Sequence, residues 1–265
     1  MRVLIVGAGH LGSWFAKVLA QDNTVAVYDT NSGKTKALVG LTKIFQLEEV
    51  ESFRPEIVLN AVNLENTIEA FETLFPMLPS ECIISDIASV KTGLADFYQN
   101  SGFRFVSTHP MFGPSHPSFG NNFGEKHNCK GEFAVIIEES DEVGKSFFRQ
   151  IYESLQIKVF DYSFAKHDKV MAYTLSIPFT SSIVFAACMR QQQAPGTTFK
   201  KQLDLAKNVL SEDDYLLSEI LFNPHTVRQL ELIGSKLAHL THIIKDKDYE
   251  TMNLFLTRLR ANVVQ

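Results

Sequence analysis

The first residues that could do chemistry form a glycine-rich segment near the start of the chain. Residues 7–12 read GAGHLG, which is the GxGxxG spacing of a dinucleotide-binding turn. In that setting Gly7 permits a tight turn, Gly9 lets the backbone approach a pyrophosphate, and Gly12 lets the following helix pack closely on the preceding strand. The amides and the dipole at the start of that helix then favour the phosphates.

Asp29 follows the glycine turn at the spacing expected of a carboxylate that binds the ribose of a dinucleotide. Asp29 closes the second apolar run, 22 residues after Gly7, where it can accept hydrogen bonds from both ribose hydroxyls. It also repels a 2′-phosphate, and residues 30–32 supply no cation to receive one, although Lys34 and Lys36 lie close by. We therefore expect NAD rather than NADP. A glycine-rich turn without a ligand and a methyltransferase-type site remain as alternatives.

Two later segments carry the other candidate chemical groups. Residues 86–91 read DIASVK and residues 108–114 read THPMFGP, and each follows an apolar run of strand length. Ligands of open α/β sheets bind at the carboxyl ends of strands, so both segments are expected near the nicotinamide. There His109 can take a proton from a substrate hydroxyl while hydride leaves the same carbon. On spacing alone, it can equally be a turn histidine held by the prolines and glycine around it.

The elements that must position these residues alternate along the first part of the chain. Apolar runs of strand length occur at residues 2–6, 24–28, 57–62, 82–87, 103–107, 133–138 and 158–162. Helical spacing occurs between most of them, at residues 14–19, 67–78, 93–100 and 142–155. This alternation predicts an α/β fold, a Rossmann-like domain with a mostly parallel sheet and helices on both faces. Only helical periodicity remains after about residue 163, so we expect a dinucleotide-binding domain over residues 1–163 and an all-helical domain over residues 164–265.

The composition narrows the class of protein further. Hydrophobic residues make up 45% and charged residues 21% of the 265 residues, the balance of a folded globular protein. A net charge of -5 argues against nucleic acid as a partner, because phosphate backbones attract basic surfaces. Cys82, Cys129 and Cys188 are far apart and form no CxxC pair, so neither a disulfide framework nor a metal site is expected. The first apolar run is too short for a secretory signal, and we expect a cytoplasmic protein.

An apolar segment late in the chain has two interpretations. Residues 170–189 run twenty positions between Lys169 and Arg190 without a charge, which is long enough to cross a bilayer. Five hydroxyl side chains and a central Pro178 favour a buried, kinked helix instead, so we expect no membrane span. The segment has more apolar surface than one small helical domain can easily cover. We therefore expect a homodimer formed through the helical domain.

The two chemical segments together resemble a known family. DIASVK followed by THPMFGP is similar to the paired signature of the prephenate and arogenate dehydrogenases of tyrosine biosynthesis. The likeness covers nearly the whole chain, because the His167-Asp168 pair and LSEILFNP at residues 217–224 also resemble that family. It implies oxidative decarboxylation of prephenate to 4-hydroxyphenylpyruvate, in which the ring hydroxyl carbon gives hydride to NAD and the ring carboxylate leaves as CO2.

The same resemblance implies roles for individual residues. His109 would accept the proton of the substrate hydroxyl, and Ser89 would orient His109 and the nicotinamide. Lys91 is either a site residue or an exposed lysine at a helix N-terminus. The family's histidine in the helical domain is absent here and Phe179 is the candidate replacement, while Lys200 stands where the family holds the ring carboxylate with an arginine. The residues expected to bind the cofactor are Gly7, Gly9, His10, Leu11, Gly12, Asp29 and Ser89.

Two other functions remain open beside the prephenate reaction. An arogenate dehydrogenase would use the same site, but no acidic residue in the matched motifs is obviously placed to receive the ammonium of arogenate. A regulatory dinucleotide-binding module without catalysis is the alternative from a different class, and the intact His109 and Ser89 argue against it. The remaining histidines have no recognisable spacing and are expected at the surface or in packing: His116, His127, His225, His239 and His242.

Overall fold

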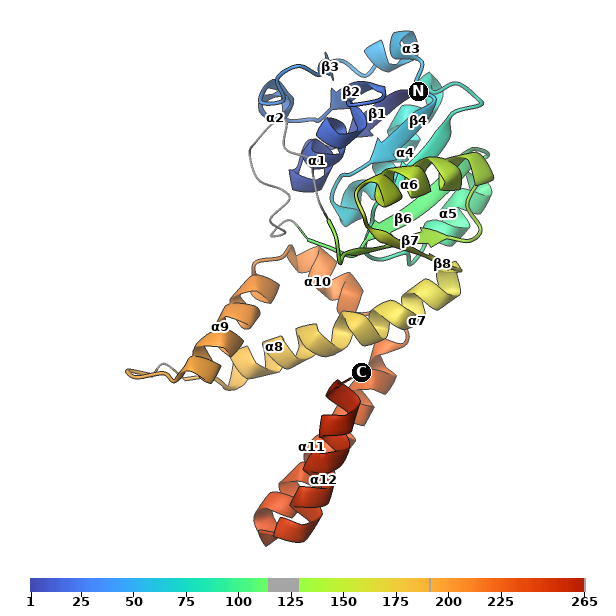
Figure 1. Ribbon diagram of the computed structural model, residues 1–265. Helices are drawn as coiled ribbons and strands as arrows, with labels where there is room; N and C mark the ends of the chain where they lie inside the picture. Colours follow the sequence, from blue (N-terminus) through green and yellow to red (C-terminus); the bar gives the residue numbers. More distant parts are fainter. Residues whose placement is uncertain (114–128, 191, 265) are drawn as a thin grey trace. The chain divides into compact units, whose positions relative to one another are not determined.

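The computed structural model describes residues 1–113, 129–190 and 192–264, and these form two compact units (Figure 1). The first unit contains Met1–Met171 together with Leu210–Ile220. The second contains Ala172–Val209 and the residues from Leu221 onward. The first unit holds the sheet, and the second is helical throughout its described elements.

The first unit is built on a sheet whose strands are parallel with one exception. In chain order the strands are β1 (Arg2–Val6), β2 (Thr24–Tyr28), β3 (Thr42–Ile44), β4 (Ile57–Asn60), β5 (Ile83–Asp86), β6 (Arg104–Pro110), β7 (Phe133–Ile137) and β8 (Lys158–Tyr162). Their order in the sheet is β3-β2-β1-β4-β5-β6-β7-β8, and among these described strands only the β6–β7 pairing is antiparallel. The predicted Rossmann-like sheet is therefore confirmed.

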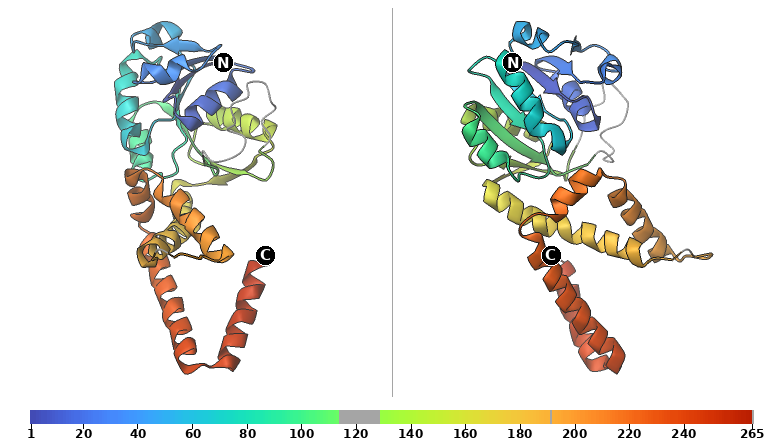
Figure 2. Two further views of the ribbon diagram at one scale, coloured as in Figure 1. Left: turned by 90° about the vertical axis from the view of Figure 1, so that its left-hand side faces the viewer. Right: turned by 180° about the vertical axis from the view of Figure 1, so that it is seen from behind.

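Helices cover both faces of the sheet because neighbouring residues of each strand point to opposite sides. Val3 and Ile5 are buried with α1 (His10–Leu19) and α6 (Glu142–Ser154) on one face. Leu4 and Val6 are buried on the other face, with α4 (Thr67–Leu74) and α5 (Leu94–Asn100). The left view of Figure 2 shows the two helical layers with the sheet between them. Two short helices complete this unit's amino-terminal part: α2 (Ser32–Lys36) and α3 (Glu49–Phe53).

The topology places the glycine turn at a switch point of the sheet. From β1 the chain runs outward through β2 to β3, and it then returns to β4 on the other side of β1. Four neighbouring strands, β1, β4, β5 and β6, are parallel, so their carboxyl ends lie at the same edge of the sheet. In such sheets the crevice at the reversal is where ligands bind.

All seven predicted strands are present, but β3 was not predicted. It has three residues and lies at the edge of the sheet, paired only with β2 among the described strands. So short a segment gives too few positions for alternation to be visible in the sequence.

The first helix after the sheet belongs to the first unit for part of its length. The compact units divide between Met171 and Ala172, inside α7 (Phe164–Thr174), whereas the sequence analysis placed a boundary near residue 163. The first turns of α7 stay with the sheet because Phe164 is buried in the core beside α5. Part of α10 (Asp214–Leu221) also belongs to this unit.

In its described residues, the second unit contains four long helices. These are α8 (Ser176–Cys188), α9 (Thr197–Leu210), α11 (Thr226–Asp246) and α12 (Tyr249–Val263). The Oγ atom of Ser176 lies 2.8 Å from Oγ1 of Thr226, which joins α8 to α11 by a buried hydrogen bond.

The long apolar segment is interrupted between α7 and α8. Pro178 lies in the first turn of α8, where a missing N–H is tolerated, and its ring would clash with the carbonyl of Thr174, at which α7 ends. Taken together, Phe164–Cys188 are long and apolar enough to cross a membrane, because their most apolar stretch of 18 residues has a mean hydropathy of 1.5. Only 22% of that stretch is buried in the structure. The helix is thus interrupted at Leu175, and the predicted burial is absent.

Candidate active site

The glycine turn after β1 has a geometry that only glycine permits at two of its positions. Gly7 has a φ of +96°, and a Cβ atom there would lie 2.7 Å from the carbonyl oxygen of Ala61. A Cβ atom at Gly12 would lie 1.9 Å from the carbonyl oxygen of Gly7. At Gly9, by contrast, no described atom lies within 4 Å of the position of a Cβ. Gly7 and Gly12 therefore serve the packing of α1 on the sheet, and Gly9 leaves the open space that a close-lying phosphate needs.

The start of α1 leaves backbone donors available at this turn. Gly9 is the N-cap residue and provides no side-chain cap, and the first turn contains no acidic side chain. His10 is exposed in that first turn, while Leu11 is half-buried and packs against the core. The uncapped amides and the helix dipole fit an anionic group at this position.

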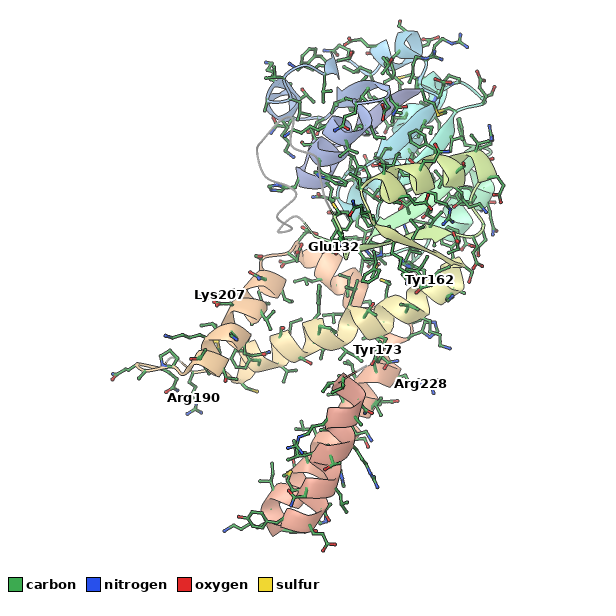
Figure 3. All side chains as sticks on the ribbon, in the orientation of Figure 1. Glu132, Tyr162, Tyr173, Arg190, Lys207 and Arg228 are labelled. Carbon is green, nitrogen blue, oxygen red and sulfur yellow. The ribbon has the colours of Figure 1, made fainter. Side chains whose placement is uncertain are left out.

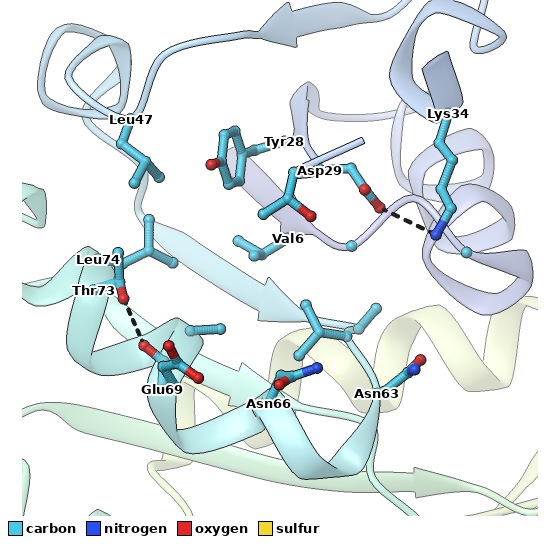
Figure 4. A pocket seen from close by; sticks show the side chains of 16 residues that line it. Val6, Tyr28, Asp29, Lys34, Leu47, Asn63, Asn66, Glu69, Thr73 and Leu74 are labelled. Atoms are coloured by element: carbon cyan, nitrogen blue, oxygen red, sulfur yellow. Dashed lines mark hydrogen bonds and ion pairs between the residues drawn. The ribbon is translucent and has the colours of Figure 1, made fainter. Parts of the chain in front are cut away.

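Asp29 at the end of β2 is oriented by the turn that it faces. Its Oδ2 atom accepts a hydrogen bond of 2.7 Å from the amide of Ala8, and its Oδ1 atom accepts one of 2.8 Å from the amide of Asn31. The ammonium of Lys34 lies 3.9 Å from Oδ2 (Figure 4). The two amides fix the carboxylate in place, and each oxygen keeps a further lone pair for a ligand hydroxyl.

A cavity of about 460 Å³ opens beside this carboxylate (Figure 4). It extends from the glycine turn to the segment before α4 and to α4 itself, where Asn63, Asn66 and, on α4, Glu69 line the side that faces Asp29. The side chains of Tyr28 and Leu47 contribute apolar surface. The cavity thus connects a site for phosphate to a space that is lined by both polar and apolar side chains and is large enough for a nucleoside.

The candidate base is part of a chain of three side chains. His109 is 5% exposed, in the last residues of β6, and its Nδ1 atom lies 3.0 Å from Nε2 of His167 on α7. Nδ1 of His167 in turn lies 3.4 Å from Oδ1 of Asp168. A carboxylate only accepts, so it favours a hydrogen on Nδ1 of His167 and leaves Nε2 of His167 as an acceptor. His109 then donates from Nδ1 and carries its lone pair on Nε2, which is the form a general base requires.

The surroundings keep both imidazoles neutral. Burial is the largest influence, and it holds the pKa of His109 well below the ordinary histidine value, with smaller contributions from His167 and Lys91. Burial also lowers the pKa of His167, against the opposing effect of Asp168. Neutral imidazole is the form that accepts a proton.

Lys91 is a buried part of this site rather than an exposed lysine. It is 1% exposed, its Nζ atom is hydrogen-bonded to Oδ2 of Asp86, and it donates a second bond of 2.7 Å to the carbonyl oxygen of Thr108. The interpretation of Lys91 as a solvent-exposed residue at a helix N-terminus was therefore wrong. The physical reason is the carboxylate of Asp86, which allows an ammonium to be buried.

The comparisons with known proteins identify the family. The family model described as "Prephenate dehydrogenase, nucleotide-binding domain" matches residues 15–156, more than half of the chain. The chain belongs to the prephenate dehydrogenase family.

Related sequences and structures agree with this membership. The chain is 22% identical to a probable arogenate/prephenate dehydrogenase of Methanocaldococcus jannaschii, over 93% of this chain and 57% of the relative. It is 24% identical to the chloroplastic arogenate dehydrogenase 1 of Arabidopsis thaliana, over 87% of this chain and 37% of the relative. The chain thus spans about half the length of these relatives or less.

Among solved structures, a prephenate dehydrogenase from A. aeolicus, in complex with hydroxyphenyl propionate and NAD+, superposes with a TM-score of 0.82 and 20% identity. That match covers 100% of this chain and 97% of the other. An arogenate dehydrogenase from Synechocystis superposes with a TM-score of 0.76 and 17% identity, over 99% and 98% of the two chains. At these identities the likeness establishes a shared fold.

Ser89 lies at the carboxyl end of its strand, as the sequence analysis expected, and its role toward His109 and the nicotinamide stays a prediction. It is half-buried in the segment after β5. Among the described residues, the hydrogen bond of Nδ1 of His109 is made by His167 and not by Ser89. The sequence analysis noted the His167-Asp168 pair as a family likeness but gave it no role. Its signal was a histidine followed by a carboxylate in the first helix after the last strand.

The two residues predicted to bind substrate lie in the second unit. Phe179 is half-buried on α8, and Lys200 is exposed on α9. Their contribution to substrate binding stays a prediction. His116 and His127 lie outside the described residues, and within the part of the chain that the structure describes no cluster of histidine, cysteine or acidic side chains could hold a metal ion.

Proposed function

We propose that this chain is an NAD-dependent dehydrogenase that converts prephenate to 4-hydroxyphenylpyruvate by oxidative decarboxylation. The observation that carries the proposal is the ordered chain from Asp168 through His167 to His109. It supports a neutral base with its acceptor on Nε2, at the carboxyl edge of a dinucleotide-binding sheet. A regulatory module would have no need of a buried, tautomerically fixed histidine at this edge.

The cofactor site fits a dinucleotide of the NAD type. We assign Gly7, Gly9, His10, Leu11 and Gly12 to the pyrophosphate, because they form the open turn and the uncapped start of α1. We assign Asp29 to the adenosine ribose and the cavity beside it to the rest of the adenosine half. The A. aeolicus enzyme of the same fold is a complex with NAD+. Bound NAD supplies the acceptor for the hydride.

The residues of this chain then have separate tasks. Nε2 of His109 accepts the proton of the ring hydroxyl as that carbon is oxidised. His167 holds the ring of His109 in one orientation and favours the tautomer with the hydrogen on Nδ1. Loss of the ring carboxylate as CO2 makes the product aromatic, which drives the reaction. Ser89, in the segment after β5, is assigned to the nicotinamide side of the site, and Lys200 and Phe179 are assigned to the substrate.

Arogenate is the second candidate substrate, since two of the relatives carry the name arogenate dehydrogenase. Prephenate and arogenate share the ring that reacts and differ in a keto acid or an amino acid on the side chain. The deciding experiment mixes purified protein with NAD and either compound. NADH formation is followed by the ultraviolet absorbance of the reduced nicotinamide. Faster turnover of arogenate would show that arogenate, and not prephenate, is the preferred substrate. If neither compound yields NADH, the alternative of a regulatory module without catalysis is favoured.

The second unit supports a homodimer as the state of the enzyme. Large apolar side chains are exposed along its helices, among them Val184 on α8, Leu237 on α11 and Leu254 on α12. Figure 3 shows Tyr173, which is 61% exposed, projecting from the carboxyl end of α7. Many exposed large apolar side chains favour an interface in a folded protein, and a second copy of the chain offers the same side chains in return.

A further inference from the structure

A buried ion pair lies beside the histidine pair and takes no part in the proton transfer assigned to His109. Lys91 is 1% exposed and Asp86 is 0% exposed. The Nζ atom of Lys91 donates to Oδ2 of Asp86, and it also donates to the carbonyl oxygen of Thr108 over 2.7 Å. Burial of two charges costs desolvation free energy, so their mutual attraction and further hydrogen bonds must offset that cost.

The hydrogen bonds around the pair hold both side chains in place. Oδ1 of Asp86 accepts a bond of 2.7 Å from the hydroxyl of Tyr98, and Oδ2 accepts one of 2.9 Å from the amide of Ala88 in addition to that from Lys91. Three donors stabilise a carboxylate in its charged form. Burial lowers the pKa of Lys91, and Asp86 opposes that effect. The carboxylate thereby holds the ammonium in place.

The ammonium is directed at the strand that carries the base. Thr108 directly precedes His109 in β6, so the bond from Lys91 to its carbonyl oxygen restrains the backbone at the base. The positive charge also acts on the imidazoles, since it lowers the pKa of both His109 and His167 in addition to the effect of burial.

We propose that Lys91 is a positioning residue for His109, whose buried ammonium, held by Asp86, fixes the end of β6 through the carbonyl of Thr108 and sets a cation beside the base. The consequence for turnover rests on the proposed dehydrogenase function. The effect on the imidazole itself is a property of the folded chain.

Other charged groups near the base act in known directions. The titratable side chains around His109 and Lys91 in the described part of the chain are His167 and Asp168 on α7, Asp86 at the end of β5, Tyr98 on α5 and Tyr152 on α6. The carboxylates oppose the effect of Lys91, and a protonated His167 would add to it. The two tyrosines are neutral, because burial raises the pKa of each.

The test removes the ammonium without leaving a buried carboxylate alone. Lys91→Met alone leaves Asp86 unpaired and can prevent folding, so the decisive variant is the double substitution Lys91→Met/Asp86→Asn. The control is Arg104→Met. It removes a cation from β6, the strand that carries the base, but this cation lies at the exposed start of the strand, where its Nε donates a bond of 2.9 Å to Asp141.

The primary measurement is the pKa of His109 by NMR of the imidazole resonances, assigned with His109→Asn. We expect the double variant to raise this pKa by about half a unit, because the simultaneous loss of the Asp86 carboxylate offsets part of the effect of the lost ammonium. Arg104→Met should leave it unchanged. An unchanged pKa of His109 in a folded double variant would overturn the inference and reduce Lys91 to a structural residue.

Turnover supplies a second measurement that also separates the two proposals. With prephenate and saturating NAD, the acid limb of the kcat/KM profile of the double variant should move to higher pH by about the same half unit, which lowers the rate at low pH by about threefold. An acid limb that does not move would also contradict the role of Lys91. If the wild-type chain forms no NADH from prephenate or arogenate, the dehydrogenase proposal fails and the NMR result still decides the role of Lys91.

Discussion

Nδ1 of His109 lies 3.0 Å from Nε2 of His167, although 58 positions separate the two residues in the chain. One belongs to β6 and the other to α7, the first helix after the sheet. The helix therefore does more than lead out of the sheet, because it orients the ring that accepts a proton. Since both rings belong to the first compact unit, this arrangement is formed by that unit alone.

Substitution of the base gives the first prediction. His109→Asn should lower kcat for NADH formation by about a hundredfold or more, because a general base contributes about 10²–10⁴ in rate. The dissociation constant of NAD, measured by fluorescence titration, should stay unchanged. If NAD binding and kcat fall together, the histidine is structural.

The pH dependence of the wild-type enzyme is the second prediction. His109 must be neutral to accept a proton, and burial keeps its pKa well below the ordinary value of about 6.5. The value of kcat/KM should therefore rise with pH through a single ionisation with a midpoint below about 6.5, and it should be level above it. A midpoint above that value, or a profile without an acid limb, contradicts the assignment.

The orienting role of His167 gives the third prediction. His167→Ala removes the acceptor for Nδ1 of His109 and should lower kcat by about tenfold, the effect of losing one net hydrogen bond to the base. His167→Gln offers a side-chain oxygen in its place and should recover part of the loss. If the alanine variant changes KM alone and leaves kcat intact, His167 binds substrate instead of orienting the base.

The sheet could be predicted from the sequence because the local hydrophobic patterns of its strands agree with the tertiary structure. Residues 3–6 are apolar throughout and are followed by glycines, as expected of a strand buried on both faces, and β1 is buried at Val3, Leu4, Ile5 and Val6. The edge strand β3 lacked such a pattern, and it was missed for that reason.

The site was predicted less completely, because its contacts join residues far apart in the chain. The glycine turn is local, and its geometry follows from spacing. The burial of Lys91 depends on Asp86 and on the carbonyl of Thr108, which is 17 positions away. The contact between His109 and His167 spans an even longer separation. No periodicity within one segment encodes either arrangement.

Cofactor choice gives the fourth prediction and rests on Asp29. Its fixed carboxylate suits a ribose diol and repels a 2′-phosphate, so kcat/KM should be much higher with NAD than with NADP. Asp29→Ser should narrow the difference, since Lys34, which lies 3.9 Å from the carboxylate, is then free of its partner and available to a phosphate. Lys34→Ala in the serine background should widen the gap again. Equal kcat/KM values for the two cofactors in the wild type would contradict the role of Asp29.

The oligomeric state is the fifth prediction. Light scattering should report about twice 29.8 kDa for the purified chain. Leu237→Glu places a charge on the exposed apolar surface of α11 and should shift the protein toward monomer, whereas Ser235→Glu, about 200° around the same helix, serves as the matched control. A monomer at micromolar concentration in the wild type rules out the homodimer. A protein that is soluble only in detergent would support the membrane interpretation of Phe164–Cys188 instead.

The last prediction concerns the substrate's ring carboxylate and the lysine that stands in for an arginine. Lys200 is exposed on α9, where a single ammonium can bind a carboxylate but lacks the two-pronged geometry of a guanidinium. Lys200→Ala should raise KM for prephenate by about tenfold to a hundredfold, the range for loss of a hydrogen bond to a charged group, and leave NAD affinity unchanged. Lys200→Arg should keep or improve binding.

Lys201 is the control for this experiment, because the next residue of a helix points about 100° away. Lys201→Ala should leave KM nearly unchanged. If Lys201→Ala is the damaging substitution, the correspondence between this helix and the family's arginine is displaced by one residue. If neither substitution changes KM, the carboxylate is bound by another group, for which the partner subunit of the proposed dimer is the next place to search. Because prephenate and arogenate both carry this carboxylate, the same change in KM is expected for either, and the experiment tests the site independently of which compound the enzyme prefers.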